Sequence, residues 1–380
     1  MRVAIITESF PPDINGVAHS VVRVAEHLVA SGHEPLVIAP EPASGTARVA
    51  GHLPYPVVRV PSMPMPGYPS FRLGLPSRKL TEALLGHGTE LVHLASPFFL
   101  GARGSAVAQR LRLPHVAVYQ TDIPAYASAY RMRGLGEAAA WRWLRAIHNA
   151  ADRTLAPSTA SATALHAHGI ERVWLWRRGV DTVRFDPRHR SAAVRRALAP
   201  GGEILVGYVG RLALEKRVDL LAPIATRPGV RLVIIGGGPA EPVLRKALPG
   251  AVFLGPRQGR QLARLYASLD VFVHSGPYET FGQTVQEASA SGVPVVAPAA
   301  GGPVDLVADG VSGYLVPPLS AQALDDAVGV LCASPRLRQE FGAAARAMVL
   351  TRSWSAIGDQ LLGHYRDVLG SRVSAVPVAA

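Results

Sequence analysis

Two glutamates, Glu279 and Glu287, are the side chains in this sequence with the clearest capacity for chemistry. They flank a segment that contains Gly282, and the strand-like run 271–275 precedes them. A helix that begins at Gly282 directs its free backbone N–H groups and the positive end of its dipole beyond the sheet, which favours a phosphate. From the loop, Glu279 can accept hydrogen bonds from sugar hydroxyls, and Glu287 on the helix can accept both hydroxyls of a ribose. Together these features predict a site for a nucleotide-sugar.

A purely structural interpretation of the two glutamates is also open. Charged side chains are mostly exposed, so Glu279 could be a turn residue and Glu287 a solvated helix position. The residues that follow, 288–297, are mostly small or apolar and run into another expected strand. This pattern favours a mostly buried helix around Glu287.

Three further loops of the second half follow expected strands. Arg211 and Lys216 lie five residues apart after the strand 204–209. The planar guanidinium of Arg211 and the compact ammonium of Lys216 can there bind one diphosphate. Gly237 lies in a glycine run that permits close backbone approach to a nucleotide. Arg257 follows the next strand and can stack on or hydrogen-bond to a purine. For each of these side chains, solvation at the surface is the alternative.

Two loops of the first half carry polar groups at the same kind of position. Asn15 and Gly16 open a helix after the first strand, and Gly16 allows a phosphate to approach main-chain amides. Gln120, Thr121 and Asp122 follow the strand 115–119, in position to meet a sugar. The structural alternatives are a simple turn at Gly16 and helix capping by Asp122. Because the first loop has no GxGxxG pattern, a dinucleotide oxidoreductase is disfavoured.

The elements that must position these loops alternate between strand and helix in both halves of the sequence. Such alternation implies right-handed crossovers and a parallel sheet covered on both faces, hence an α/β fold of two tandem doubly wound, Rossmann-like domains. We expect domains at 1–180 and 190–350, and a segment 351–380 whose helix crosses back to the first domain. Ligands of doubly wound sheets bind beyond the carboxyl ends of the strands, so the expected active site is the cleft that these ends border.

Composition narrows the class of protein further. The chain has 380 residues and 48% hydrophobic residues, which suits two cores. The net charge of +12 is spread over both halves, and only 6% of residues are aromatic, so nucleic acid is a weak hypothesis. A single cysteine, Cys332, excludes an internal disulfide and favours a reducing cytoplasm. No apolar run approaches the ~18 residues of a membrane span, and the amino terminus becomes polar too early for a signal peptide.

A metal ion is not expected. The histidines are scattered, no Asp-X-Asp sequence occurs, and no cluster has the spacing of metal ligands. Arg211, Lys216 and helix N-termini would then neutralise the leaving diphosphate.

The order of these motifs resembles the retaining family 4 glycosyltransferases of GT-B fold over essentially the whole chain. The resemblance includes the paired glutamates, the segment 291–294 (Ser-Gly-Val-Pro) and the tail around Trp354. It implies that Arg211 and Lys216 hold the donor diphosphate, that Glu279 and the amides after it hold the sugar, and that Glu287 holds the ribose. Taken together, the loops and the resemblance predict these donor-binding residues: Asn15, Gly16, Arg211, Lys216, Gly237, Arg257, Glu279, Thr280, Phe281, Gly282, Gln283, Thr284 and Glu287.

The resemblance also implies a reaction. Retention of configuration in this family is usually explained by attack of the acceptor on the front face of the sugar. The predicted catalytic residues are Arg211, Lys216, Glu279 and Gln120. Many members have histidine where this chain has Gln120, so we assign Gln120 to sugar orientation. The predicted acceptor-binding residues are Thr121, Asp122 and Tyr126.

Within the family, the segments 119–122, 141–145, 156–159 and 178–181 look most like GDP-mannose-dependent α-mannosyltransferases that act on membrane glycolipids. The similarity implies GDP-mannose as the donor, no further cofactor, and a glycolipid or α-mannoside as the acceptor. A UDP-sugar donor (glucose or N-acetylglucosamine), a UDP-sugar 2-epimerase and a non-enzymatic two-domain sugar-binding protein are the alternatives.

A lipid acceptor would suit the segment 63–79, which combines large apolar and basic side chains. Its members are Met63, Met65, Tyr68, Phe71, Arg72, Arg78 and Lys79. They could contact an anionic bilayer, which would place the protein in the cytoplasm and peripherally at the inner face of the membrane. A packed loop of the first domain is the alternative.

Overall fold

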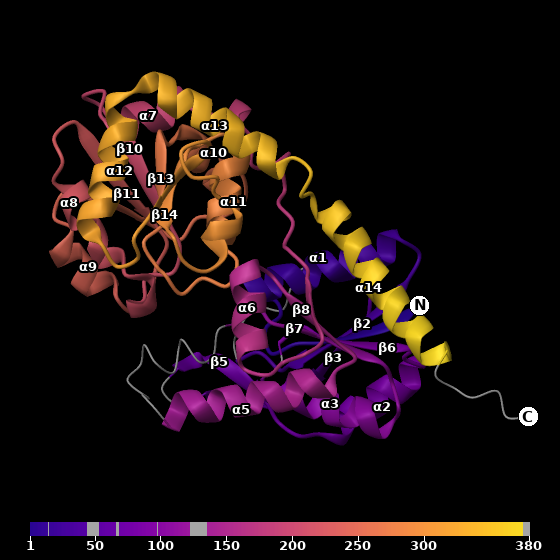
Figure 1. The fold of residues 1–380 in the computed structure, drawn as a ribbon. Coiled ribbons are helices and arrows are strands. Elements are labelled where there is room, and N and C mark those ends of the chain that lie inside the picture. The colour runs from indigo at the N-terminus through magenta and orange to yellow at the C-terminus, as the bar shows by residue number, and fades with distance from the viewer. Residues whose placement is uncertain (14, 44–52, 66–67, 97, 122–134, 375–380) are drawn as a thin grey trace, which may run out of the picture. The chain divides into compact units, whose positions relative to one another are not determined.

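The structure is a computed structural model that describes residues 1–13, 15–43, 53–65, 68–96, 98–121 and 135–374 (Figure 1). The chain divides into two compact units. Unit 1 comprises Met1–Arg178 and Trp354–Ala380, and unit 2 comprises Gly179–Ser353. Each unit has its own parallel sheet with helices on both faces, which confirms the predicted α/β class with two Rossmann-like sheets.

The sheet of unit 1 has the strand order β3-β2-β1-β6-β7-β8-β9, with parallel pairing throughout. Its strands are β1 (Arg2–Ile6), β2 (Glu34–Pro40), β3 (Val57–Val60), β6 (Leu91–Leu94), β7 (His115–Val118), β8 (Arg153–Ala156) and β9 (Val173–Leu175). Alternate residues of β1 serve the two faces: Val3 and Ile5 belong to one apolar cluster, and Ala4 and Ile6 to another. Burial on both faces explains why the strands are continuous apolar runs in the sequence.

The helices of unit 1 are α1 (Gly16–Ala30), α2 (Arg78–His87), α3 (Phe99–Arg110), α5 (Leu135–Ala150), α6 (Thr159–Ala167) and α14 (Trp354–Ser374). α14 returns the chain to unit 1 and packs beside α1 (Figure 1). Its Ile357 carbonyl accepts a hydrogen bond from Trp176 Nε1 at 3.0 Å, and its buried Tyr365 hydroxyl lies 2.7 Å from His93 Nδ1. The last helix is therefore part of the core of the unit in which the chain begins.

The segment expected as a membrane loop contains an antiparallel pair, β4 (Ser62–Met65) and β5 (Tyr68–Gly74). Arg72 is held within this pair, because its Nε donates to Ser62 Oγ at 2.8 Å and its Nη2 to the Ser62 carbonyl at 2.9 Å. No helix in the described part of the chain has both the length and the apolar character to span a bilayer.

The sheet of unit 2 has the strand order β12-β11-β10-β13-β14-β15, again parallel. The strands are β10 (Ile204–Val209), β11 (Val230–Ile235), β12 (Val252–Gly255), β13 (Val271–Val273), β14 (Val295–Pro298) and β15 (Gly313–Val316). The α-helices are α7 (Ala192–Leu198), α8 (Ala222–Ala225), α9 (Glu241–Ala247), α10 (Gly259–Ser268), α11 (Gln283–Ala290), α12 (Ala321–Ala333) and α13 (Pro335–Val349). Short 3₁₀ turns lie at η1 (Pro187–His189), η2 (Leu214–Lys216), η3 (Val218–Leu221) and η4 (Gly302–Asp305).

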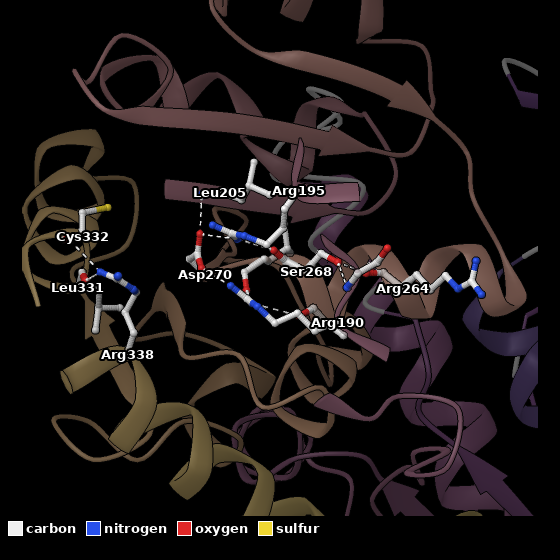
Figure 2. A network of polar contacts seen from close by, with 12 residues as sticks. Arg190, Arg195, Leu205, Arg264, Ser268, Asp270, Leu331, Cys332 and Arg338 are labelled. Atoms are coloured by element: carbon white, nitrogen blue, oxygen red, sulfur yellow. Dashed lines mark hydrogen bonds and ion pairs between the residues drawn. The ribbon is translucent and has the colours of Figure 1, made fainter. Parts of the chain in front are cut away.

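A polar network around Asp270 fixes the start of β13 (Figure 2). Asp270 Oδ2 accepts hydrogen bonds from the Leu205 amide at 2.9 Å and from Arg195 Nη1 at 2.8 Å, and Oδ1 accepts from Arg190 Nη2 at 2.8 Å. Arg190 also donates to the Leu269 carbonyl at 3.0 Å. These contacts join α7, the end of α10, and the two central strands β10 and β13, whose carboxyl ends carry the predicted site.

Candidate active site

The loop after β10 holds Arg211 beside a carboxylate that the sequence analysis did not single out. Arg211 Nη2 donates to Glu215 Oε1, and the Glu215 side chain is buried. The buried Tyr208 hydroxyl donates to the Arg211 carbonyl at 3.1 Å. These contacts hold the backbone and the guanidinium group of Arg211, and about a third of its side chain stays exposed. Only the fold could reveal the role of Glu215, because a Glu in a charged loop carries no special signal.

Lys216 and Glu279 lie together, as the adjacency of β10 and β13 requires. Lys216 Nζ is 2.7 Å from Glu279 Oε2, and the two side chains are 15% and 21% exposed. A second contact joins the same loops, because Ser275 Oγ donates to the Lys216 carbonyl at 2.8 Å. Two residues predicted separately for the diphosphate and the sugar thus form one ion pair.

His274 is a further member of this group that sequence reasoning missed. It follows β13 directly, it is 2% exposed, and its Nε2 lies 3.9 Å from Glu279 Oε2. Burial lowers the pKa of His274 to about 4; the Glu279 carboxylate opposes this shift and the Lys216 ammonium adds to it. The imidazole is therefore neutral at neutral pH.

Gly282 and the loop before it give α11 an N-terminus without a side-chain cap. Gly282 has φ +97°, a left-handed conformation that other residues adopt only with strain. The preceding Phe281 is buried, whereas Thr280, Gln283 and Thr284 are half-buried. An uncapped helix N-terminus leaves amides for an anion.

Two adjacent glycines after β14, which the sequence analysis did not use, hold this loop in place. The Gly302 amide donates to the Glu279 carbonyl at 2.7 Å. A Cβ on Gly301 would overlap the Glu279 carbonyl oxygen, and a Cβ on Gly302 would overlap Phe281. The loop after β14 therefore needs glycine to fit against the loop after β13.

Glu287 lies on α11 with neighbours different from those of Glu279. Burial raises its pKa to about 7, and the nearby Tyr266, Gln283 and Arg184 side chains act in the opposite direction. Gln283 Nε2 donates to the Gly179 carbonyl at 3.2 Å. The two glutamates of the motif thus occupy distinct environments in unit 2: Glu279 pairs with a cation, whereas Glu287 is a carboxyl group in a low-dielectric position.

The glycine run 236–238 has a structural use in addition to the predicted approach to a nucleotide, which stays a prediction. A Cβ on Gly236 would overlap the Gly210 carbonyl, and one on Gly238 would overlap that of Leu212. The Leu212 amide also donates to the Gly237 carbonyl at 3.0 Å. The run therefore packs against the loop that carries Arg211.

Arg257, the residue proposed to meet the base, lies apart from these contacts. Its Nη1 donates to the carbonyl of the neighbouring Pro256 at 2.9 Å. The structure thus brings Lys216 and Glu279 into direct contact, whereas Arg257 is not joined to them.

In unit 1, Asn15 caps α1, because its Oδ1 accepts from the Val17 and Ala18 amides, both at 3.0 Å. Arg178, which the site prediction omitted, is buried and donates from Nη1 to the Gly16 carbonyl at 3.1 Å and from Nη2 to Gln120 Oε1. Gln120 Nε2 donates in turn to the Ala95 carbonyl at 2.8 Å. Both ends of the Gln120 amide are therefore engaged within the protein.

The remaining acceptor residues are placed as follows. Thr121 is exposed at the end of the described segment after β7, and Asp122 and Tyr126 lie outside the described residues.

Comparison with solved structures places the fold among glycosyltransferases. HepE of Anabaena, solved with UDP and glucose, matches with a TM-score of 0.76 at 21% identity and covers 96% of this chain and 99% of that one. Sucrose-phosphate synthase from Thermosynechococcus elongatus matches with a TM-score of 0.81 at 22% identity and covers 97% and 99%. At these identities the likeness concerns the fold.

Sequence comparison establishes the family. Residues 14–184 match Glycosyltransferase Family 4, and residues 190–348 match Glycosyl transferases group 1. A GDP-mannose-dependent alpha-mannosyltransferase of Mycobacterium tuberculosis is 50% identical over 98% of both chains. Proteins of the same name from Mycolicibacterium smegmatis and Corynebacterium glutamicum are 48% and 44% identical over 98% and 97% of this chain and 99% and 89% of their own lengths. The chain therefore belongs to the family 4 glycosyltransferases.

Proposed function

We propose that this enzyme transfers mannose from GDP-mannose to a glycolipid or α-mannoside acceptor. The observation that carries the proposal is the Lys216–Glu279 pair at the carboxyl ends of β10 and β13, beside the uncapped N-terminus of α11. A cation and helix amides suit a diphosphate, and a carboxylate suits sugar hydroxyls. Relatives at 44–50% identity that bear the name of this activity support the choice of mannose and guanine.

Each proposed donor contact follows from the chemistry of the side chain. Arg211 and Lys216 bind the diphosphate, with Arg211 held ready by Glu215. Glu279 accepts hydrogen bonds from the sugar, and Glu287 accepts the ribose hydroxyls when it is ionised. In unit 1 we retain Gly16 as a phosphate contact, whereas Asn15 acts through the helix cap.

Gln120 acts indirectly in this proposal, and the acceptor contacts come from its neighbours. Because Arg178 and the Ala95 carbonyl engage its amide, Gln120 positions Arg178 and does not itself move a proton. Thr121, Asp122 and Tyr126 are the proposed acceptor contacts.

The proposed reaction needs no metal ion and proceeds with retention. The acceptor hydroxyl attacks the front face of the anomeric carbon as the diphosphate leaves, and a phosphate oxygen takes the proton. Lys216, Arg211 and the α11 amides stabilise the charge that develops on the leaving group. A chelator should leave the initial rate unchanged; loss of activity in EDTA with rescue by Mg²⁺ would contradict this part of the proposal.

A transfer assay with a panel of donors tests the proposal. GDP-mannose, UDP-glucose, UDP-N-acetylglucosamine and ADP-glucose are offered with an α-mannoside acceptor, and NMR reports the anomeric configuration of the product. We expect turnover of GDP-mannose to an α-linked product. Exclusive use of UDP-sugars would select the alternative donor. Epimerised sugar without transfer would indicate a 2-epimerase, and binding without turnover would indicate a sugar-binding protein.

For a lipid acceptor we propose contact with an anionic membrane through unit 1, on its cytoplasmic side. Phe99 on α3 and Trp143 on α5 are 49% and 44% exposed, with ring centroids 6.3 Å apart, and Met63 is 43% exposed. Exposed Arg78 and Lys79 supply positive charge. Aromatic and basic side chains together suit a bilayer interface.

Sedimentation with phosphatidylglycerol vesicles tests this surface. We expect Trp143→Ala to weaken binding and Trp174→Ala, a change at another exposed tryptophan, to serve as the matched control. Equal binding by wild type and Trp143→Ala would contradict the proposed surface.

A further inference from the structure

His274 combines deep burial with unmet hydrogen-bonding capacity. It is 2% exposed, and neither ring nitrogen makes a well-formed hydrogen bond among the described residues; the Gly276 backbone gives only a weaker contact. A buried polar group left without a partner destabilises the folded state, so such groups are uncommon in folded proteins. A ligand atom that completes the hydrogen bonding is a physical reason for keeping a histidine here, because a leucine of similar size would otherwise be the more stable choice.

The distance between His274 and Glu279 matches the span that one such atom can bridge. Nε2 and Oε2 are 3.9 Å apart, which is too far for a direct hydrogen bond. A single oxygen atom can lie at about 2.8 Å from both, since polar groups separated by more than about 3.5 Å are commonly bridged in this way. Glu279 Oε2 already accepts from Lys216 Nζ at 2.7 Å, which holds the carboxylate in place.

The bridging atom must be able to both accept and donate. A neutral imidazole can present an N–H at Nε2, and the ionised carboxylate only accepts. A hydroxyl group meets both demands, because its oxygen takes the hydrogen bond from histidine and its proton goes to glutamate. A phosphate oxygen fails the second demand, since it has no proton to offer the carboxylate.

We infer that His274 and Glu279 together hold one hydroxyl group of the transferred sugar, which accepts from His274 Nε2 and donates to Glu279 Oε2. The inference rests on the proposed donor site and adds a specificity-determining residue to it. A site built around a hydroxyl rejects a sugar that lacks it, because the buried nitrogen and the carboxylate then lose their common partner. His274 thus selects among hexoses by one hydroxyl position.

The test is a cycle of protein variants and deoxy sugars. Donor binding and kcat/KM are measured for GDP-mannose and its 2-, 3-, 4- and 6-deoxy analogues, with wild type, His274→Leu and His274→Gln. In wild type, one analogue should lose about 10- to 100-fold relative to the parent sugar. With GDP-mannose, His274→Leu should lose a similar factor in kcat/KM, and removing the same hydroxyl from the sugar should cost this variant little more. His274→Gln keeps an N–H near the position of Nε2 and should recover part of the loss.

A matched control separates this contact from a general effect of removing a buried histidine. His148 in unit 1 is also fully buried with Nε2 lacking a partner, so His148→Leu should leave the pattern across the deoxy series unchanged. Equal sensitivity of wild type and His274→Leu to every deoxy analogue would overturn the inference. Should wild type turn over only another nucleotide hexose, the mannose assignment would fail, and the deoxy series of that hexose would still decide the role of His274.

Discussion

At the scale of single residues, the ion pair between Lys216 and Glu279 is the centre of the proposed donor site. Their opposite charges are partly shielded from solvent and lie at hydrogen-bonding distance, which fixes both side chains at the carboxyl ends of β10 and β13. The sequence indicates both residues because each follows a strand at a carboxyl end. It does not indicate that they touch, since 62 positions separate them. Glu215 and His274 are missed for the same reason, because long-range packing gives them their roles.

Replacement of Lys216 tests its assignment to the diphosphate. Lys216→Ala should lower kcat by about 10²–10³, a loss typical for one charge-stabilising donor, and should leave the fold intact. Lys246→Ala, at an exposed lysine on α9, is the control and should retain wild-type turnover. Initial rates of mannose transfer and circular dichroism provide the readouts. Wild-type turnover by Lys216→Ala would remove this residue from the site.

The pKa of Glu287, raised to about 7, predicts a pH dependence of donor binding. Only the ionised carboxylate accepts both ribose hydroxyls, so the affinity for GDP-mannose should rise as pH increases through about 7. Glu287→Gln should bind more weakly and show no such rise. Calorimetric titration between pH 6 and 8.5 measures both, and a flat profile in wild type would contradict the ribose assignment. The stability of the protein without donor should follow the opposite trend: with the pKa of Glu287 raised from 4.5 to about 7, it should fall as the pH rises from about 4.5 to about 7.

At the scale of elements, glycines bring the loops of unit 2 together. The sequence marks the glycine run 236–238 as a point of close backbone approach, and in the structure the loop after β10 approaches Gly236 and Gly238. Contact of this run with a nucleotide stays a prediction. Gly301 and Gly302 likewise allow close packing against the loop that carries Glu279. A glycine-rich loop in a sequence indicates a close backbone contact, but the fold is needed to identify the group that makes the contact.

Gly282→Ala tests the geometry at the start of α11. The left-handed backbone would cost about 1–2 kcal/mol, and the new Cβ would lie 3.2 Å from Leu306 Cδ1, so the loop should shift. We expect weaker binding of GDP-mannose together with lower stability. Gly202→Ala is the matched control, because its φ is +82°, no atom lies within 4 Å of the added Cβ, and it precedes β10. This control should lose stability but keep donor affinity; equal affinity of both variants would argue against a role for the α11 N-terminus.

The hydrogen bonds and ion pairs of Asp270 should stabilise unit 2 (Figure 2). Burial favours the neutral acid, but hydrogen bonds from Leu205, Arg190 and Arg195 outweigh it and lower the pKa of Asp270. The stability gained is therefore present at neutral pH and is lost as the pH falls through the depressed pKa. Asp270→Asn should reduce the free energy of unfolding by about 2–4 kcal/mol in urea titrations at pH 7. Asp326→Asn, at an exposed position on α12, should change it little.

At the scale of the whole molecule, alternating strand and helix patterns are enough to predict two doubly wound sheets. Parallel strands are buried on both faces, so their apolar runs stand out, and β10 and α10 have the predicted bounds. The β4–β5 pair is not predicted, because prolines at 61, 64, 66 and 69 hide the strand signal. Arg178 is likewise missed, because its contacts with Gly16 and Gln120 span most of unit 1.

The most direct measurement is calorimetric titration of wild type, Lys216→Ala and Glu279→Ala with GDP-mannose and UDP-glucose at equal concentrations. We expect wild type to bind GDP-mannose more tightly than UDP-glucose. Each substitution should weaken GDP-mannose binding at least about tenfold, since each removes a charged hydrogen-bonding partner of the donor. Unchanged affinity in both variants, or a preference of wild type for UDP-glucose, would contradict this expectation.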